Sequence, residues 1–344
     1  MVTPLRVAAD GIELPKVRCA AFHAGLDVDP VGTAGAYDVF LCVEVPLPWE
    51  RDISLHEPFL SLLGAGTGSV KDPSGRTIRP QGLVPRPGAE GWTRVLLFDQ
   101  PDGSEAGPYR RREWWLDATE VPELCRAVVE ADGPGLARFD ERLVEVPDQV
   151  VDLLVCTHGK RDTCCGSTGA VLFDQLVAGL GPAPGPAGLR VWRTSHTGGH
   201  RFAPTALSFP DGYAWAHLDQ SLAMSLLARS VAPAELAGRC RGSSALPGGA
   251  AQAADRAALG EVGWIWAEAR RSAVVTGFDR TSLATDVRIE GELPGGRRLA
   301  FDVRVEVERH VPQPTCGAVE GPEYKVEPVW TVASVAPVVH AGPG

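Results

Sequence analysis

The residues Val150–Cys156 (VVDLLVC) form a nearly continuous apolar run. Such a run is typical of a β-strand that is buried on both faces, as in a sheet covered by helices. Ala170–Leu180 has helical spacing and ends before Gly181-Pro182, a pair that stops helices. Leu189–Thr194 then predicts a second strand. A strand, a helix and a strand in this order indicate a parallel β-α-β unit.

The segments that follow extend this unit. Thr205–Phe209 and Tyr213–His217 are separated by Pro-Asp-Gly, which predicts two strands joined by a tight turn. Gln220–Arg229 has the composition of a helix. The resulting order, β-α-β-β-β-α, is the layout of a thioredoxin-like domain. We assign residues 148–240 to this domain.

The flanking parts of the chain mix strands and helices without such a regular order. Residues 1–147 predict an N-terminal α+β domain, with strands at Tyr37–Pro46, Trp92–Asp99 and Arg111–Leu116 and a helix at Val121–Glu130. Residues 241–344 predict a C-terminal α+β extension, with a helix from about Ala250 to Arg271 and strands at Val287–Glu290 and Leu299–Val307. The expected fold class is therefore α/β combined with α+β.

Composition excludes several functional classes. The net charge of −10, without a basic run, leaves no electrostatic footprint for nucleic acid. The sequence contains no run of about 18 apolar residues, so no membrane span is predicted. The start of the chain lacks the pattern of a signal peptide. We therefore expect a cytoplasmic protein. In such a chain, three cysteines between positions 156 and 165 indicate metal or redox chemistry rather than disulfides.

Two segments carry candidate ligands for a metal. Cys156, Cys164 and Cys165 follow the first buried strand, and His196-Thr-Gly-Gly-His200 follows the second. The carboxyl ends of neighbouring parallel strands meet at one edge of a sheet, so both segments are expected to converge there. Thiolate and imidazole ligands suit iron–sulfur clusters, zinc or copper. Geometry alone allows either Cys164 or Cys165 as a ligand.

The spacing of these residues resembles a known family. Three patterns are similar to those of the thioredoxin-like [2Fe–2S] ferredoxins, also called the sucrase/ferredoxin-like family. They are Cys156-x-His-Gly-x-Arg-Asp-x-x-Cys165-Gly, His196-x-Gly-Gly-His200 and the following tail Arg-Phe-Ala-Pro-Thr. The resemblance implies that Cys156, Cys165, His196 and His200 ligate a [2Fe–2S] cluster. It favours Cys165 over Cys164, which we expect to be a small buried residue. The sequence marks no carboxylate pair for glycoside hydrolysis.

The expected function is electron transfer rather than stand-alone catalysis. A cluster of this kind implies redox partner proteins, namely a reductase and an electron acceptor, which the sequence does not identify; neither does it reveal the oligomeric state. The candidate residues surrounding the ligands are His158, Lys160, Arg161, Cys164 and Arg201. Arg161 or Lys160 is expected to offset charge at the cluster, with Asp162 holding Arg161 in place.

Two alternatives remain at this point. The first is a structural zinc module, although zinc fingers usually space their cysteines more closely than Cys156 and Cys165. The second is a thiol–disulfide oxidoreductase that uses Cys164 and Cys165, although such enzymes usually carry Cys-x-x-Cys at a helix N-terminus. The remaining cysteines are expected to be packing residues, at positions Cys19, Cys42, Cys125, Cys240 and Cys316.

Overall fold

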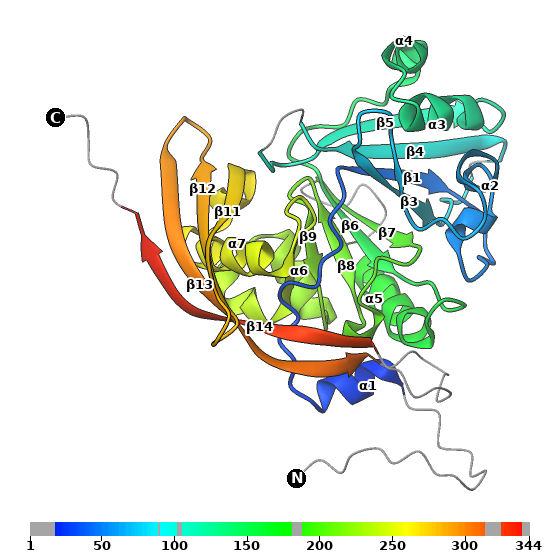
Figure 1. Cartoon of the computed structure of the whole chain (residues 1–344). Helices are drawn as coiled ribbons and strands as arrows, with labels where there is room; N and C mark the ends of the chain where they lie inside the picture. Colours follow the sequence, from blue (N-terminus) through cyan, green and yellow to red (C-terminus); the bar gives the residue numbers. More distant parts are fainter. Residues whose placement is uncertain (1–17, 89, 102–104, 181–187, 314–324, 339–344) are drawn as a thin grey trace, which may run out of the picture.

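Two β-sheets organise the protein in the computed structural model (Figure 1), a large mixed sheet and a smaller antiparallel sheet. The structure describes residues 18–88, 90–101, 105–180, 188–313 and 325–338. Gly181-Pro182 and Cys316 lie outside these ranges. The large sheet has the strand order β10 (Cys240–Ser243), β9 (Tyr213–Trp215), β8 (Ala206–Phe209), β6 (Val151–Cys156), β7 (Leu189–Thr194), β3 (Thr77–Leu83), β1 (Val39–Glu44), β4 (Trp92–Asp99) and β5 (Arg110–Asp117), with β2 (Val70–Lys71) pairing to β3.

The middle of the chain confirms the expected order of elements. β6 and β7 are parallel neighbours, and α5 (Ala170–Leu180) connects them. β8 returns antiparallel to β6 and forms a hairpin with β9, before α6 (Gln220–Leu227). Leu153, Leu154 and Val155 have no exposed surface. The continuous apolar run of β6 therefore reflects its place between two other strands, with both faces covered.

The N-terminal part contains the three expected strands, β1, β4 and β5, and the expected helix, α3 (Val121–Val129). Two short helices, α2 (Phe59–Leu63) and α4 (Gly133–Ala137), also lie in this part. β3 was not predicted, because Pro80 interrupts its apolar pattern. This strand matters for the whole fold, because Leu83 pairs with Thr194 of β7. One sheet thus continues across the boundary expected at residue 147.

The C-terminal part forms the second sheet, in the order β11 (Arg270–Asp279), β12 (Ala284–Glu292), β13 (Arg298–Gln313) and β14 (Lys325–Pro337). α7 (Gly249–Val262) packs against these strands and against β10. The helix was expected to reach Arg271, but the observed helix is shorter. It ends at Gly263, whose φ of 89° lies in the left-handed region, and a short helical turn then leads into β11.

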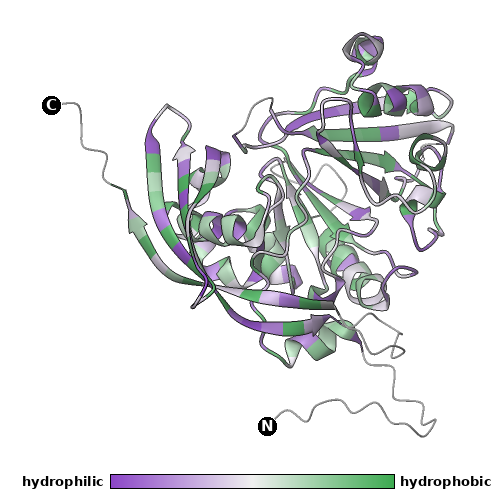
Figure 2. Cartoon of the chain, in the orientation of Figure 1, coloured by the Kyte–Doolittle hydropathy of each residue, from purple (hydrophilic) through white to green (hydrophobic). Residues whose placement is uncertain are grey.

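Hydropathy follows this arrangement. In Figure 2, hydrophobic residues are concentrated along the central strands of the large sheet, whereas hydrophobic and hydrophilic residues alternate along β13. The small helix α1 (Cys19–Ala24) lies beside the ends of β13 and β14 in Figure 1. Among the described residues, no helix has both the length and the apolar character needed to cross a membrane.

Candidate metal centre

The carboxyl ends of β6 and β7 lie side by side and bring the two ligand segments together. The parallel register pairs Cys156 directly with Thr194. The backbone N–H of Thr157 donates to the carbonyl of Thr194 at 3.0 Å, which extends the pairing by one residue. The loop after Cys156 and the turn that begins at His196 therefore leave the sheet at the same edge, as the β-α-β pattern predicts.

The first segment folds into a tight loop before α5. A turn of π-helix, Cys165–Gly169, leads directly into that helix. A Cβ atom at Gly169 would lie 2.0 Å from the carbonyl oxygen of Cys156, and one at Gly166 would lie 2.2 Å from the Cα of Gly159. Only glycine permits such close approaches of two backbone segments. These glycines hold Cys165 against the end of β6.

The second segment is a turn with two consecutive left-handed residues. Gly198 and Gly199 have φ values of 82° and 66°, after which a short helical turn begins at His200. The buried guanidinium of Arg241 packs over Gly199, where a Cβ atom would lie 2.3 Å from its Cζ. Arg241 also donates to the carbonyl oxygen of Gly198 at 3.1 Å. The Gly-Gly pair thus sets the angle at which both histidines face the loop.

Strand β3 supports this turn from the N-terminal part of the chain. The backbone N–H of Ser195 donates to the carbonyl of Gly82 at 2.8 Å, and the N–H of Gly82 donates to Ser195 Oγ at 2.9 Å. The side-chain amide of Gln81 donates to Thr194 Oγ1 at 3.0 Å. The position of His196 therefore depends on residues more than a hundred positions earlier in the chain.

The structure brings the four expected ligands into one neighbourhood. Cys156 and Cys165 are both fully buried, and their side chains are hydrogen-bonded to each other. Cys156 also contacts His196 through a side-chain hydrogen bond. The rings of His196 and His200 have centroids 6.1 Å apart. Two thiols and two imidazoles are thus adjacent at the end of one β-α-β unit.

Asp162 joins the two histidines, a role that the sequence did not indicate. One carboxylate oxygen lies 3.2 Å from Nδ1 of His200, and the other lies 3.3 Å from Nδ1 of His196. Asp162 therefore faces the histidines instead of Arg161, which was its expected partner. The Nδ1 atom of His196 is buried and, within the described residues, makes no hydrogen bond of acceptable geometry. Such an orphaned nitrogen fits a position that a metal or a carboxylate completes.

Cys19 is the second residue that the sequence did not indicate. Although it was expected to be a packing cysteine, its Sγ lies 3.1 Å from His200 Nδ1 and 3.6 Å from Cys164 Sγ. Cys164 is buried, as expected, and faces Cys19. Helix α1 thereby adds a thiol to the centre from 145 residues away. No local motif marks Cys19, so only the fold reveals its position.

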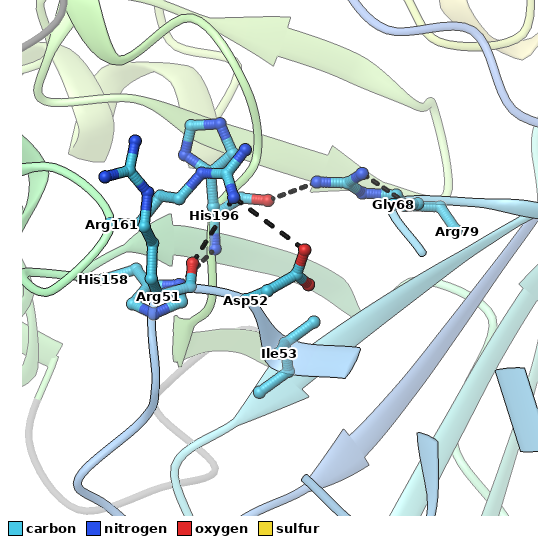
Figure 3. A pocket seen from close by; sticks show the side chains of 8 residues that line it. All are labelled: Arg51, Asp52, Ile53, Gly68, Arg79, His158, Arg161 and His196. Atoms are coloured by element: carbon cyan, nitrogen blue, oxygen red, sulfur yellow. Dashed lines mark hydrogen bonds and ion pairs between the residues drawn. The ribbon is translucent and has the colours of Figure 1, made fainter. Parts of the chain in front are cut away.

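The other residues expected to surround the ligands each contact a different partner. His158 is buried, accepts from the N–H of His196 at 3.3 Å and lies 2.6 Å from the carbonyl of Glu50. Lys160 pairs with the Glu50 carboxylate at 2.6 Å, on the surface. Arg161 lies 3.9 Å from Asp52 and lines a small cavity with His158 and His196 (Figure 3). Arg201 is buried and forms an ion pair with Glu327 of β14.

Burial and mutual contact shift the protonation of these groups. The hydrogen bond from Cys165 holds the pKa of the Cys156 thiol well below its usual range, whereas the same contact and burial raise the pKa of Cys165 well above it. Burial raises the pKa of Asp162 to about 6. Burial, followed by the nearby His196, lowers the pKa of His200 to about 4. At neutral pH Asp162 is therefore ionised and the His200 imidazole is neutral.

The donors are neighbours but do not enclose a single point. Within the described ranges, no group of three or more His, Cys, Asp or Glu side chains is arranged to hold one metal ion. The chemistry of the donor set, two thiols and two imidazoles, matches the ligands that iron–sulfur clusters and zinc share.

Comparison with known proteins identifies the family. The family model described as sucrase/ferredoxin-like matches residues 30–242, which include β1, the whole β-α-β unit and both ligand segments. No curated protein and no solved structure matches the chain. Because the family model covers more than half of the chain, this protein belongs to the sucrase/ferredoxin-like family.

Proposed function

We propose that this protein is an electron carrier that holds a [2Fe–2S] cluster through Cys156, Cys165, His196 and His200. The observation that carries the proposal is the meeting of two fully buried thiols with two imidazoles at the ends of β6 and β7. The family match adds support, because it covers both ligand segments. When bound, such a cluster accepts and returns one electron.

The residues of the chain divide into two pairs in this proposal. Cys156 and Cys165 supply the thiolates for one iron, since they touch each other at the base of the loop. His196 and His200 supply neutral imidazoles for the other iron. Neutral ligands in place of thiolates raise the reduction potential above that of all-cysteine clusters. Asp162 orients both rings, as carboxylates do beside many metal-bound histidines.

The proposal extends to the fold and to the partners. The order β6-α5-β7-β8-β9-α6, with β6 and β7 parallel, supports a thioredoxin-like arrangement of this region. A carrier of single electrons needs a reductase and an acceptor. Both would approach the histidines, whose side chains are 18% and 17% exposed, rather than the fully buried cysteines.

Measuring the iron content of variants of the adjacent residues Cys164 and Cys165 tests this proposal. The full chain, purified without oxygen, is expected to be coloured and to contain about two irons and two sulfides per chain, as the cluster type requires. Cys165→Ser should abolish iron binding, because it removes a ligand thiolate. Cys164→Ser serves as the matched control and should retain iron.

Other outcomes would contradict the assignment. A colourless protein with one zinc per chain would support the structural zinc module instead. Loss of iron from Cys164→Ser and retention by Cys165→Ser would exchange the roles of the two cysteines. A protein without metal, in which Cys164 and Cys165 exchange disulfides with small thiols, would support the oxidoreductase.

A further inference from the structure

A small cavity lies beside His196. It has a volume of about 30 Å³, and its lining comes from several separate parts of the chain (Figure 3). The charged and ring-bearing side chains around it are Arg51, Asp52, Arg79, His158, Arg161 and His196. This volume accommodates a small polar group but not a nucleotide or a ring system.

Positive charge exceeds negative charge around this cavity. Arg79 gives its donors to neutral acceptors, the carbonyl oxygens of Gly68 at 2.6 Å and His196 at 2.8 Å and the side chain of Gln81 at 3.2 Å. Within the described residues, all of these acceptors are uncharged and none is a carboxylate. The guanidinium of Arg51 is exposed, and its charge, like that of Arg161, acts on the Asp162 carboxylate.

The carboxylates nearby balance only part of this positive charge. Asp52 uses one oxygen to cap a helical turn through the N–H and hydroxyl of Ser54, each at 3.0 Å, and its other oxygen lies 3.9 Å from Arg161. Asp162 faces the two histidines, and the charges of Arg161 and Arg51 also act on it. Three guanidinium groups thus meet two carboxylates, in a chain whose net charge is −10.

We propose that this cavity binds a small oxyanion, a phosphate or carboxylate group, between the guanidinium groups of Arg51 and Arg161 at the edge of His196. Guanidinium groups bind such oxyanions through paired, charge-assisted hydrogen bonds. Arg79 contributes fixed positive charge from β3, and its own donors are already engaged. A local excess of cations in an otherwise acidic protein is the electrostatic signature of an anion site.

Calorimetric titration of the full chain with sodium phosphate tests this proposal, with sodium chloride holding the ionic strength constant. The parent protein should bind phosphate saturably. The double variant Arg51→Gln/Arg161→Gln should weaken binding by about tenfold or more, since each arginine supplies a charge-assisted hydrogen bond. Arg126→Gln removes the same charge from the exposed face of α3 and should leave binding unchanged.

A second titration with sodium acetate identifies the preferred group, because tighter binding of acetate than of phosphate assigns the site to carboxylates. Absence of saturable binding of either anion would overturn the proposal. Equal affinity in the double variant and the parent would also overturn it, since binding would then lie elsewhere. Both arginines are exposed, so circular dichroism should show a folded double variant.

A bound anion should also affect the midpoint potential of the cluster, an expectation that rests on the proposed function. An anion beside His196 cancels positive charge near the redox centre and should lower its midpoint potential. Phosphate should therefore shift the potential of the parent downward and leave that of the double variant in place. Phosphate binding without such a shift would overturn the coupling, and iron analysis tests the cluster separately.

Discussion

At the residue scale, Asp162 is the carboxylate that lies between the two candidate histidine ligands. Its two oxygens lie 3.2 and 3.3 Å from their Nδ1 atoms, and it is almost fully buried. A carboxylate in this position fixes the ring orientation of metal-bound histidines and increases their basicity. This arrangement makes Asp162 a positioning residue rather than a ligand in the proposed centre.

Asp162→Asn should weaken iron retention about 10–100-fold, the usual cost of losing such a partner. Competition with a chelator, followed through the colour of the protein, measures this loss. Asp117→Asn removes a carboxylate from an exposed position and provides the control. If Asp162→Asn retains iron as firmly as the parent, the histidines do not rely on Asp162. A shifted visible spectrum in the variant would separate altered ligation from simple unfolding.

At the scale of elements, a buried charge network joins β6 and β7 to β5. Asp152, at the start of β6, has no exposed surface and accepts from Arg190 at 2.7 and 3.0 Å. It also accepts from Arg111 of β5 at 2.9 Å and from the indole of Trp192 at 2.7 Å. Arg190 in turn pairs with Glu113 of β5. This network ties the N-terminal strands to the strands that carry the ligands.

Asp152→Ala should lower the free energy of unfolding by about 3–5 kcal/mol, because it removes the buried carboxylate that Arg190 and Arg111 share. Urea unfolding followed by tryptophan fluorescence measures the change. Asp302→Ala breaks an exposed ion pair with Arg288 and should cost no more than about 1 kcal/mol. Equal effects of the two substitutions would show that the network does not stabilise the sheet.

At the scale of the whole molecule, the second sheet contacts both α1 and the histidine turn of the candidate metal centre. His23 on α1 is buried, and its Nε2 lies 3.1 Å from the carbonyl oxygen of Pro312 on β13. Arg201, next to His200, pairs with Glu327 of β14. The last two strands therefore hold both the helix that carries Cys19 and the turn that carries the histidines.

Acid should loosen the contact between α1 and the second sheet. Burial, followed by the charge of Arg201, lowers the pKa of His23 to about 4. Between about pH 6.5 and about pH 4, the unfolded chain binds a proton at His23 that the folded protein excludes. The contribution of His23 to stability is therefore complete above pH 6.5 and is lost as the pH falls toward 4.

Thermal unfolding of the parent and of His23→Gln across this pH range measures the effect. Glutamine keeps a donor for the Pro312 carbonyl but does not titrate, so the variant should lose less stability on acidification. His310→Gln, which replaces an exposed histidine on β13, is the control. An identical pH dependence in His23→Gln and the parent would contradict the prediction.

The sequence by itself determined the features that have a local period. The apolar run of β6, the helical spacing of α5 and the hairpin of β8 and β9 lie where they were expected. The convergence of Cys156, Cys165, His196 and His200 also follows from the sequence, because parallel strands joined by a helix end at one edge. Local patterns failed where one residue changes the course of the chain, as at Gly263, or where proline masks a strand, as at Pro80.

Only the tertiary structure decided what surrounds these four residues. Cys19, Arg51 and Arg79 reach the centre from 145, 110 and 117 residues away, distances over which no periodicity operates. Asp162 lies within the motif, yet its direction toward the histidines depends on how the loop packs against the segment that carries them. Such contacts depend on how whole elements pack, because burial and charge act between surfaces that come together only in the folded chain.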